Sequence, residues 1–254
     1  MTYATPSLYV EPIRLIRSDA TFPAAICFCH DADIRRLYTH HPFLHPNEQA
    51  VYMKYEHARR QKSYLLGRYV AKQATAKLIG ETQLSRVEIR QGVFQFPIVG
   101  HPTSSNVQVS LSHCDDFACA VAFPEEHPLG IDIEEINPDR NTLIRDQATP
   151  AELRLLSQLP LGEDVAMTTL WTAKEALSKI LRTGMMTPFS LFEMEKLTVA
   201  DGVVTGEYTN FAQYKLVSFQ LGGYICTIAA PRRTELSSLQ IGRIQAQFAS
   251  MGTR

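Results

Sequence analysis

The pentapeptide Gly130-Ile-Asp-Ile-Glu134 is the most informative stretch of the chain. On a β-strand, side chains alternate between the two faces, so Asp132 and Glu134 project together while the isoleucines pack on the other side. Two carboxylates spaced roughly 6.5–7 Å along a strand can converge on one hard cation. The alternative is a solvent-facing strand edge with incidental acids. The pattern predicts a strand in either case and leaves the use of its carboxylates open.

A second motif, Trp171-Thr-Ala-Lys-Glu-Ala-Leu-Ser-Lys179, lies on a long helix predicted from about residue 164 to 183 and closed by Gly184. Glu175 lies away from the apolar stripe of this helix, with Lys179 one turn further on. By itself this spacing is that of an ordinary surface ion pair. Beside the acidic strand, however, Glu175 would complete a set of three carboxylates for magnesium. Lys174 and Lys179 would then meet the phosphates that the metal bridges.

Two further features carry polar groups. Ser110-Leu-Ser-His113 ends a predicted strand, and its histidine can either donate to a phosphate or cap a turn. Residues 51–77 contain seven Lys or Arg and one acid, and a basic face of the predicted helix repeats at steps of four from Arg60 to Lys72. This face is either solvated or the wall of an anion-binding site.

The remaining pattern predicts an α+β fold. A helix is expected over about residues 50–79, ending at Gly80, and a short helix opens at Thr149-Pro150. Strand-like runs come after each long helix and end in similar stretches, at 117–122 and 224–229. We therefore expect two similar halves, 1–128 and 129–254, related by a pseudo-twofold axis and packed face to face. Each half would have a small, mostly antiparallel sheet and one long helix, and the second would end in a polar tail.

Composition excludes several classes of protein. With 25 basic and 26 acidic residues the net charge is −1, so we expect no nucleic-acid partner and no membrane binding. No segment approaches the roughly 18 apolar residues of a membrane span, and the expected location is the cytoplasm. The five cysteines fit reduced thiols. Cys27-Phe-Cys29 with His30 is interpreted as part of a buried strand and not as half of a metal site, and His40, His41 and His45 as a solvated loop.

In this order and spacing, the motifs resemble those of the Sfp-type 4′-phosphopantetheinyl transferases. The acidic strand and the helix motif, about 40 residues apart, resemble the two signature motifs of that family. The segments 44–48, 64–68, 110–113 and 184–188 resemble its pre-helix loop, first long helix, serine–histidine element and glycine–proline segment. The resemblance runs from about residue 44 to 230, and the first 40 residues have no match.

The resemblance implies the 4′-phosphopantetheinyl transferase fold and a reaction. The phosphopantetheine arm of coenzyme A would pass to a serine of an apo peptidyl, acyl or aryl carrier protein, with release of 3′,5′-ADP. Mg²⁺, or Mn²⁺ in its place, would be bound by Asp132, Glu134 and Glu175. Glu175, directly or through a metal-bound water, would also take the proton of the serine, and Lys179 would neutralise the pyrophosphate.

For coenzyme A, the resemblance implies contacts to its phosphates from His113, Ser112 and Lys174, with Arg60, Arg90 and Lys54 as candidates for the 3′-phosphate. Gln95-Phe96-Pro97 departs from the family's Gly-Lys-Pro, so a lysine near the nucleotide is absent, and Phe96 could stack on adenine instead.

Two other functions remain open: another magnesium-dependent phosphoryl- or nucleotidyl-transfer enzyme, or a non-catalytic module that binds coenzyme A or a carrier. The chain lacks the Gly-x4-Gly-Lys-Ser/Thr loop of nucleoside triphosphatases. Two tandem halves indicate the monomeric, broad-specificity branch of the family, which serves peptide, polyketide and siderophore synthesis and sometimes fatty-acid carriers. Met185 and Met186 are expected to form an apolar rim for the carrier.

Overall fold

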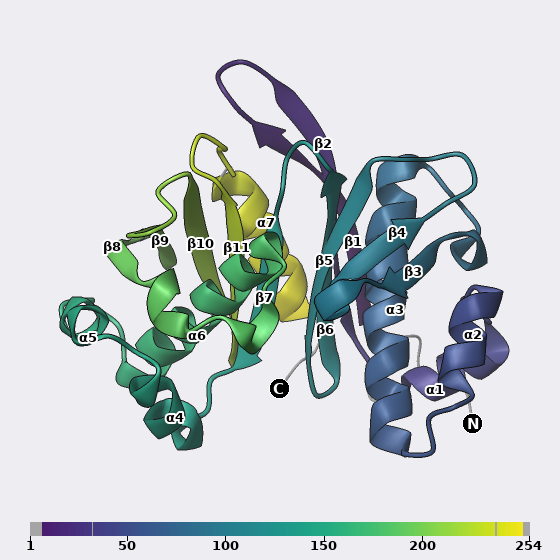
Figure 1. Ribbon diagram of the computed structural model, residues 1–254, viewed down its shortest axis with the longest axis horizontal. Helices are drawn as coiled ribbons and strands as arrows, with labels where there is room; N and C mark the ends of the chain where they lie inside the picture. Colours follow the sequence, from purple (N-terminus) through teal and green to yellow (C-terminus); the bar gives the residue numbers. More distant parts are fainter. Residues whose placement is uncertain (1–6, 32, 237, 251–254) are drawn as a thin grey trace.

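The computed structural model describes residues 7–31, 33–236 and 238–250 (Figure 1). Two antiparallel sheets lie side by side, which confirms the predicted α+β class. The first has the order β1-β2-β6-β5 and the second β7-β11-β10-β9-β8. Their strands are β1 (Ser7–Ile16), β2 (Thr21–His30), β5 (Val107–Cys114), β6 (Phe117–Pro124), β7 (Gly130–Glu135), β8 (Met194–Ala200), β9 (Val203–Tyr208), β10 (Tyr214–Leu221) and β11 (Tyr224–Pro231).

The central strands of the first sheet, β2 and β6, are buried on both faces. The face toward the long helix α3 (Ala58–Ile79) carries small residues such as Cys27, Cys29 and Ala120, which let the helix lie close to the sheet. The other face carries larger side chains such as Ile26 and Phe28. The two cysteines are fully buried, which confirms that this stretch is an apolar strand.

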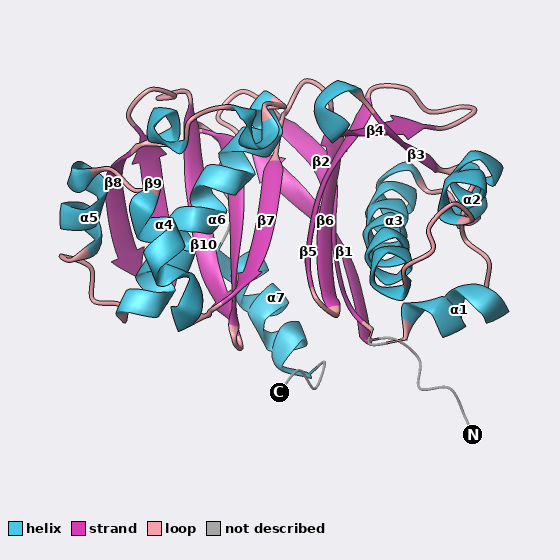
Figure 2. Cartoon of the chain, turned by 60° about the horizontal axis from the view of Figure 1, so that its bottom comes forward, coloured by secondary structure: helices cyan, strands magenta, loops and turns pink. Residues whose placement is uncertain are grey.

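A shared core joins the two sheets. Ile131 and Ile133 of β7 pack in it with residues of the first sheet, so their alternation with Asp132 and Glu134 is as predicted. Helix α7 (Ser238–Ser250) lies between the sheets and adds Ile244 to the same core (Figure 2). The polar tail is therefore largely this helix. Because the core belongs to both halves, the division of the chain after residue 128 stays a prediction.

The single helix predicted over residues 50–79 is wrong. A short helix, α2 (Pro46–Tyr52), is capped at its C-terminal end by Met53, and α3 begins after His57. The first turn of α2 is pinned by a capping box between His45 and Glu48. The long helix ends as predicted, with Gly80 in the left-handed conformation (φ 73°). A small hairpin of β3 (Glu88–Gln91) and β4 (Pro97–Gly100) follows, and α1 (Ile34–His40) precedes α2.

The second half repeats this arrangement. Helix α4 (Asn141–Asp146) precedes α5 (Pro150–Leu156), which opens with the predicted cap at Thr149 and a capping box to Glu152. The long helix α6 (Glu163–Leu181) covers the second sheet. It ends before the predicted Gly184, because Arg182 already takes the left-handed conformation (φ 57°). Among the helices in the described ranges, none has the length and apolar character needed to cross a bilayer.

Candidate functional site

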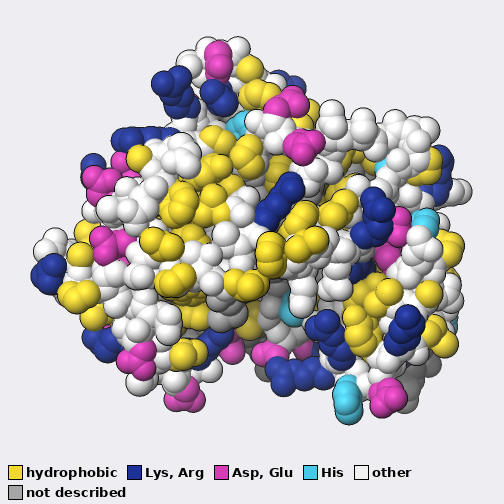
Figure 3. Space-filling view, in the orientation of Figure 1, with side chains coloured by type: hydrophobic (Ala, Val, Ile, Leu, Met, Phe, Trp, Pro, Cys, Tyr) yellow, Lys and Arg dark blue, Asp and Glu magenta, His cyan; other side chains and the backbone are white. Residues whose placement is uncertain are grey.

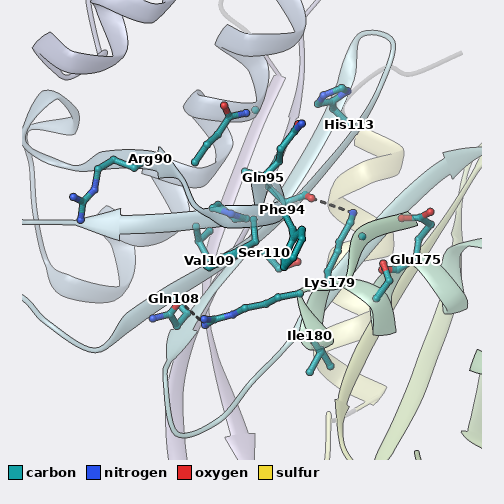
Figure 4. A pocket seen from close by; sticks show the side chains of 18 of the residues that line it. Arg90, Phe94, Gln95, Gln108, Val109, Ser110, His113, Glu175, Lys179 and Ile180 are labelled. Carbon is teal, nitrogen blue, oxygen red and sulfur yellow. Dashed lines mark hydrogen bonds between the residues drawn. The ribbon is translucent and has the colours of Figure 1, made fainter. Parts of the chain in front are cut away.

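A cleft of about 320 Å³ separates the two halves, lined by α3, β5 and the β3–β4 hairpin on one side and by α6 on the other (Figure 4). Its charged lining is strongly basic: Arg60, Arg68, Arg90, Lys179 and Arg182 face a single carboxylate, Glu175. In Figure 3 a basic side chain lies in the middle of this face, among exposed hydrophobic groups from both halves. A basic cleft in a nearly neutral chain favours a polyanionic ligand.

Asp132 lies at the base of this cleft, on the edge strand β7. It is 2% exposed. One carboxylate oxygen, Oδ1, accepts hydrogen bonds from Ser112 Oγ at 2.7 Å and from Lys179 Nζ at 2.7 Å. The other oxygen, Oδ2, is buried without a hydrogen-bond partner in the described part of the chain. An unpaired buried carboxylate oxygen is costly, so this atom marks a position where a cation or a donor is favourable.

Lys179 joins the two sheets at this point. Its ammonium group donates to Leu111 O (3.1 Å) on β5, to Ile131 O (2.8 Å) on β7 and to Asp132. Burial alone would lower the pKa of Lys179, but Asp132 and then Glu175 raise it above its ordinary value, so the side chain stays charged. Because all three N–H donors are used, Lys179 acts on a bound phosphate through its charge.

Two glutamates flank this pair. Burial raises the pKa of Glu175 and the charge of Asp132 raises it further, to about 7, with Lys179 opposing the shift. Burial and Asp132 also raise the pKa of Glu134, while an ion pair with Arg140 lowers it. The predicted ligands thus perturb one another's protonation. Within the described residues, however, no three His, Cys, Asp or Glu side chains are gathered closely enough to hold a metal ion.

The predicted metal site is therefore not preassembled, because Lys179 holds Asp132 and Arg140 holds Glu134. The chemistry of the donors nevertheless fits a hard divalent cation. Carboxylate oxygens are the ligands that Mg²⁺ prefers, and the unpaired Oδ2 of Asp132 is available to it. A cation beside Asp132 would also relieve the repulsion that raises the pKa values of the two glutamates.

The serine–histidine element positions β5 against β7. Ser110 Oγ accepts a hydrogen bond from the Ile131 backbone N–H at 3.0 Å. His113 lines the cleft, with its Nε2 2.9 Å from Ser63 Oγ. Desolvation lowers the pKa of the His113 imidazole, and the charge of Lys179 adds to the shift, so His113 is neutral at pH 7. It offers a hydrogen bond to a ligand and no charge.

Three of the predicted coenzyme A contacts, Ser112, Lys174 and Lys54, do not line the cleft. Lys174 is 1% exposed, does not line the cleft and pairs with Glu152 at 2.8 Å. It is a buried anchor and not a phosphate ligand. Lys54 is exposed on the turn after α2 and does not line the cleft. Arg60 and Arg90 do line it.

Three arginines at the site were not predicted from the sequence as functional groups. Arg68 belongs to the basic stretch that indicated an anion-binding wall, so a signal for it existed. Arg182 comes three residues after Lys179 at the end of the same helix, which is a weaker signal. Nothing local marks Arg140, whose importance comes only from its pairing with Glu134.

Comparisons with known proteins place the chain in a family. A model of the 4′-phosphopantetheinyl transferase superfamily matches residues 128–229, which contain the acidic strand and the motif of α6. A model of the 4′-phosphopantetheinyl transferase N-terminal domain matches residues 47–123, which contain His113. The chain belongs to the 4′-phosphopantetheinyl transferase superfamily. The two matched regions supply the two walls of the cleft.

Similar proteins include enterobactin synthase component D of Escherichia coli O157:H7 and of Shigella flexneri, each 32% identical over 132 residues. The alignment covers 50% of this chain and 59% of each relative. A crystal structure of a holo-(acyl-carrier-protein) synthase from Bacillus anthracis str. Ames, in complex with CoA (3′,5′-ADP), is 23% identical with a TM-score of 0.37. That match covers 44% of this chain and 96% of the synthase.

Proposed function

We propose that this protein is an Sfp-type 4′-phosphopantetheinyl transferase, which moves the phosphopantetheine arm of coenzyme A to a serine of an apo carrier protein and releases 3′,5′-ADP. The observation that carries the proposal is a cleft with five basic side chains and Glu175, one of whose lysines, Lys179, binds the buried Asp132. Coenzyme A is polyanionic and extended, so it matches such a lining. Membership of the superfamily supports the same conclusion.

The reacting group is a serine hydroxyl, which is a weak nucleophile until a base takes its proton. Glu175 lines the cleft, where its carboxylate can serve as the general base. The charge of Lys179 stabilises the phosphate oxygens as negative charge develops on them. His113 supplies a neutral hydrogen bond at the same wall.

We propose that Asp132, Glu134 and Glu175 hold Mg²⁺, with Mn²⁺ as a substitute. When bound, the ion would polarise the phosphoryl oxygens and neutralise charge on the leaving group. To hold the ion, Glu134 would have to release its ion pair with Arg140. Asp132 keeps its bond to Lys179 through Oδ1 and offers Oδ2.

Acyl and peptidyl carrier domains are the proposed partners. Because similar relatives are named for enterobactin synthase, siderophore assembly is the leading pathway. One chain supplies both walls of the cleft, which supports function as a monomer. The near-neutral composition supports a cytoplasmic enzyme without nucleic-acid or membrane partners. Met186 is 77% exposed on the rim where we expect the carrier to dock, while the side chain of Met185 lies outside the described part of the structure.

The deciding experiment is the intact mass of apo carrier domains after incubation with the protein, coenzyme A and Mg²⁺. Peptidyl, aryl and acyl carriers are tested, each beside a variant whose acceptor serine is alanine. We expect a gain of one phosphopantetheine on the serine carriers, no gain on the controls, and loss of transfer when a chelator is added. Tight binding of coenzyme A without transfer to any carrier class would instead support a non-catalytic binding module.

A further inference from the structure

Helix α7 is attached to both halves of the molecule. Its buried side chains pack in the core that the two sheets share, whereas α3 and α6 each pack in a cluster within their own half. Arg243 of α7 pairs with Glu11 of β1, in the first sheet, at 3.3 Å. Gln245 Nε2 donates to Gln220 O of β10, in the second sheet, at 3.2 Å. The helix lies after residue 229, where the region matched by the superfamily model ends.

The last turn of α7 carries one member of a cluster of three aromatic rings. The centre of the Phe248 ring lies 4.9 Å from that of Phe117 and 6.4 Å from that of Tyr224, both edge to face. The rings of Phe117 and Tyr224 stack with their centres 5.3 Å apart. Phe117 is the first residue of β6 and Tyr224 the first of β11, so the cluster joins α7 to one strand of each sheet. Rings at these distances attract one another beyond the effect of burial, which holds the two strands at a defined spacing.

This ring cluster lies beside the strand ends that carry the site. Phe117 pairs with the residue of β5 that follows His113. Tyr224 pairs with the residue of β7 that follows Glu134. Lys179 joins β5 to β7 further along both strands, through its bonds to the carbonyls of residues 111 and 131. The distance between His113 and Glu134, which come from opposite halves, therefore depends on the rings behind them.

We propose that Phe248 is a positioning residue for the transfer reaction, because its ring, packed against Phe117 and Tyr224, fixes the distance between His113 and Glu134. This inference rests on the proposed function, which gives both of those side chains a role. Phe248 is 4% exposed and does not line the cleft, so it acts through β6 and β11. Without the ring, the strand ends would relax into the space that it leaves. A shift of about 1 Å in a catalytic group is enough to slow a reaction strongly.

The test compares two alanine substitutions on one face of α7. Phe248→Ala removes the ring, whereas Ile241→Ala, the matched control, removes a buried side chain of the same core two turns earlier, about 10 Å away. Both variants should melt below the parent, so rates are measured at a temperature at which each is folded. We expect Phe248→Ala to lower the kcat of phosphopantetheine transfer by roughly 10- to 100-fold, and Ile241→Ala by less than about threefold.

Two further measurements separate positioning from binding and from general loss of packing. Affinity for adenosine 3′,5′-bisphosphate should stay within about twofold of the parent in both variants, because the basic lining of the cleft comes from α3, α6 and the β3–β4 hairpin. Phe248→Leu refills most of the space and should recover most of the lost kcat.

Cys114 gives a readout that does not depend on catalysis. It is partly exposed, whereas the other four cysteines are buried. Desolvation raises the pKa of its thiol to about 11, so alkylation by N-ethylmaleimide should be slow in the parent. Cys114 pairs with Phe117, so looser strand ends would admit water and speed its alkylation. We expect a several-fold faster rate in Phe248→Ala and the parent's rate in Ile241→Ala, measured by mass spectrometry.

Parent values of kcat and alkylation in Phe248→Ala, or equal changes in Phe248→Ala and Ile241→Ala, would overturn the positioning role. Faster alkylation with an unchanged kcat would overturn it too, because the strand ends would have moved without consequence for the reaction. If the parent transfers phosphopantetheine and one of these results is found, only the positioning role is wrong. If the parent transfers to no carrier, the proposed function fails and the positioning role fails with it.

Discussion

The two halves of the molecule are built around the same buried ion pair. In the first half, Glu48 of the short helix α2 meets Lys72 of α3 at 2.7 Å. In the second, Glu152 of α5 meets Lys174 of α6 at 2.8 Å. All four side chains are almost fully buried. Burial lowers the pKa of both lysines, and in each half the glutamate opposes that shift.

The surroundings of the two pairs also match. Both glutamates occupy the third helical position of a capping box whose helix begins with a proline. Each accepts a backbone N–H from a strand region of its own half, Ile89 at 2.7 Å and Met194 at 3.0 Å. Each lysine also donates to two backbone carbonyls. This repetition supports the predicted pseudo-twofold relation between the halves.

The halves differ in the residues that follow the lysine of the buried ion pair, Lys72 in α3 and Lys174 in α6. In α6, the next residue is Glu175, and Lys179 lies four residues further on and binds Asp132. In α3, the residues at the same spacing from the anchor are Gln73 and Lys77, and no acid stands there. The repeated lysine is therefore part of the scaffold, whereas the chemistry lies in residues that are not repeated. This explains why Lys174, although adjacent to Glu175 in sequence, is no part of the cleft.

The largest effect should come from Asp132→Asn, which keeps the size of the side chain but removes its charge. It removes a proposed metal ligand and the ion partner of Lys179, so transfer should fall by at least about 10³-fold. Circular dichroism and a cooperative melt should show a retained fold. Glu135→Gln, an exposed acid on the same strand, is the matched control and should change the rate by less than about twofold. Full activity in Asp132→Asn would remove the metal assignment.

The acidic strand was predictable because the local alternation of apolar and acidic residues determines which face of the strand is buried. Ile131 and Ile133 require one apolar face, so Asp132 and Glu134 must share the other. The helix motif was predictable for the same reason, through its apolar stripe.

The features that the sequence could not decide depend on distant partners. Lys174 and Lys179 look equivalent on a helix, and only Glu152, far away in sequence, determines that Lys174 is buried. The position of α2 against α3 likewise depends on a distant pair, because Glu48 of α2 binds Lys72 of α3. Arg140 gains its role only when β7 presents Glu134 to it.

Removing the charge of the glutamate in each buried ion pair tests whether the two pairs contribute equally to stability. Glu48→Gln leaves Lys72 buried and unpaired, and Glu152→Gln does the same to Lys174. Each should lower the free energy of unfolding by about 3–5 kcal/mol, measured by urea denaturation. Unequal losses would show that the resemblance between the anchors is only geometric.

The double variant Glu152→Leu/Lys174→Met removes both charges of the second anchor and should recover most of the lost stability. Because Lys174 is buried and does not line the cleft, affinity for adenosine 3′,5′-bisphosphate should stay within about twofold of the parent. A large loss of affinity in a well-folded double variant would restore Lys174 as a ligand-binding residue.

Two glycines sharpen the comparison further. A Cβ on Gly130 would stand 1.9 Å from the Ala176 carbonyl oxygen, so β7 touches the α6 backbone directly. Gly130→Ala should cost about 1–3 kcal/mol in unfolding free energy and displace Asp132 from Glu175, lowering kcat. On α3, a Cβ on Gly67 would meet only ordinary contacts, the nearest at 3.5 Å. Gly67→Ala should therefore stabilise the protein by about 0.5–1 kcal/mol, and equal melting temperatures for the two variants would contradict this contrast.

The smallest effect concerns how the long helices end. Helix α6 ends on Arg182, which faces the cleft, whereas α3 ends on Gly80 and Glu81, which serve the fold alone. Backbone N–H groups, first that of Gln83, and then His101 lower the pKa of Glu81 from 4.5 to about 2. The stabilising contribution of this carboxylate is therefore complete above about pH 4.5 and is lost as the pH falls toward 2. The difference in melting temperature between the parent and Glu81→Gln should shrink over that interval, and a difference that stays constant down to pH 2 would show that the carboxylate is not held by these donors.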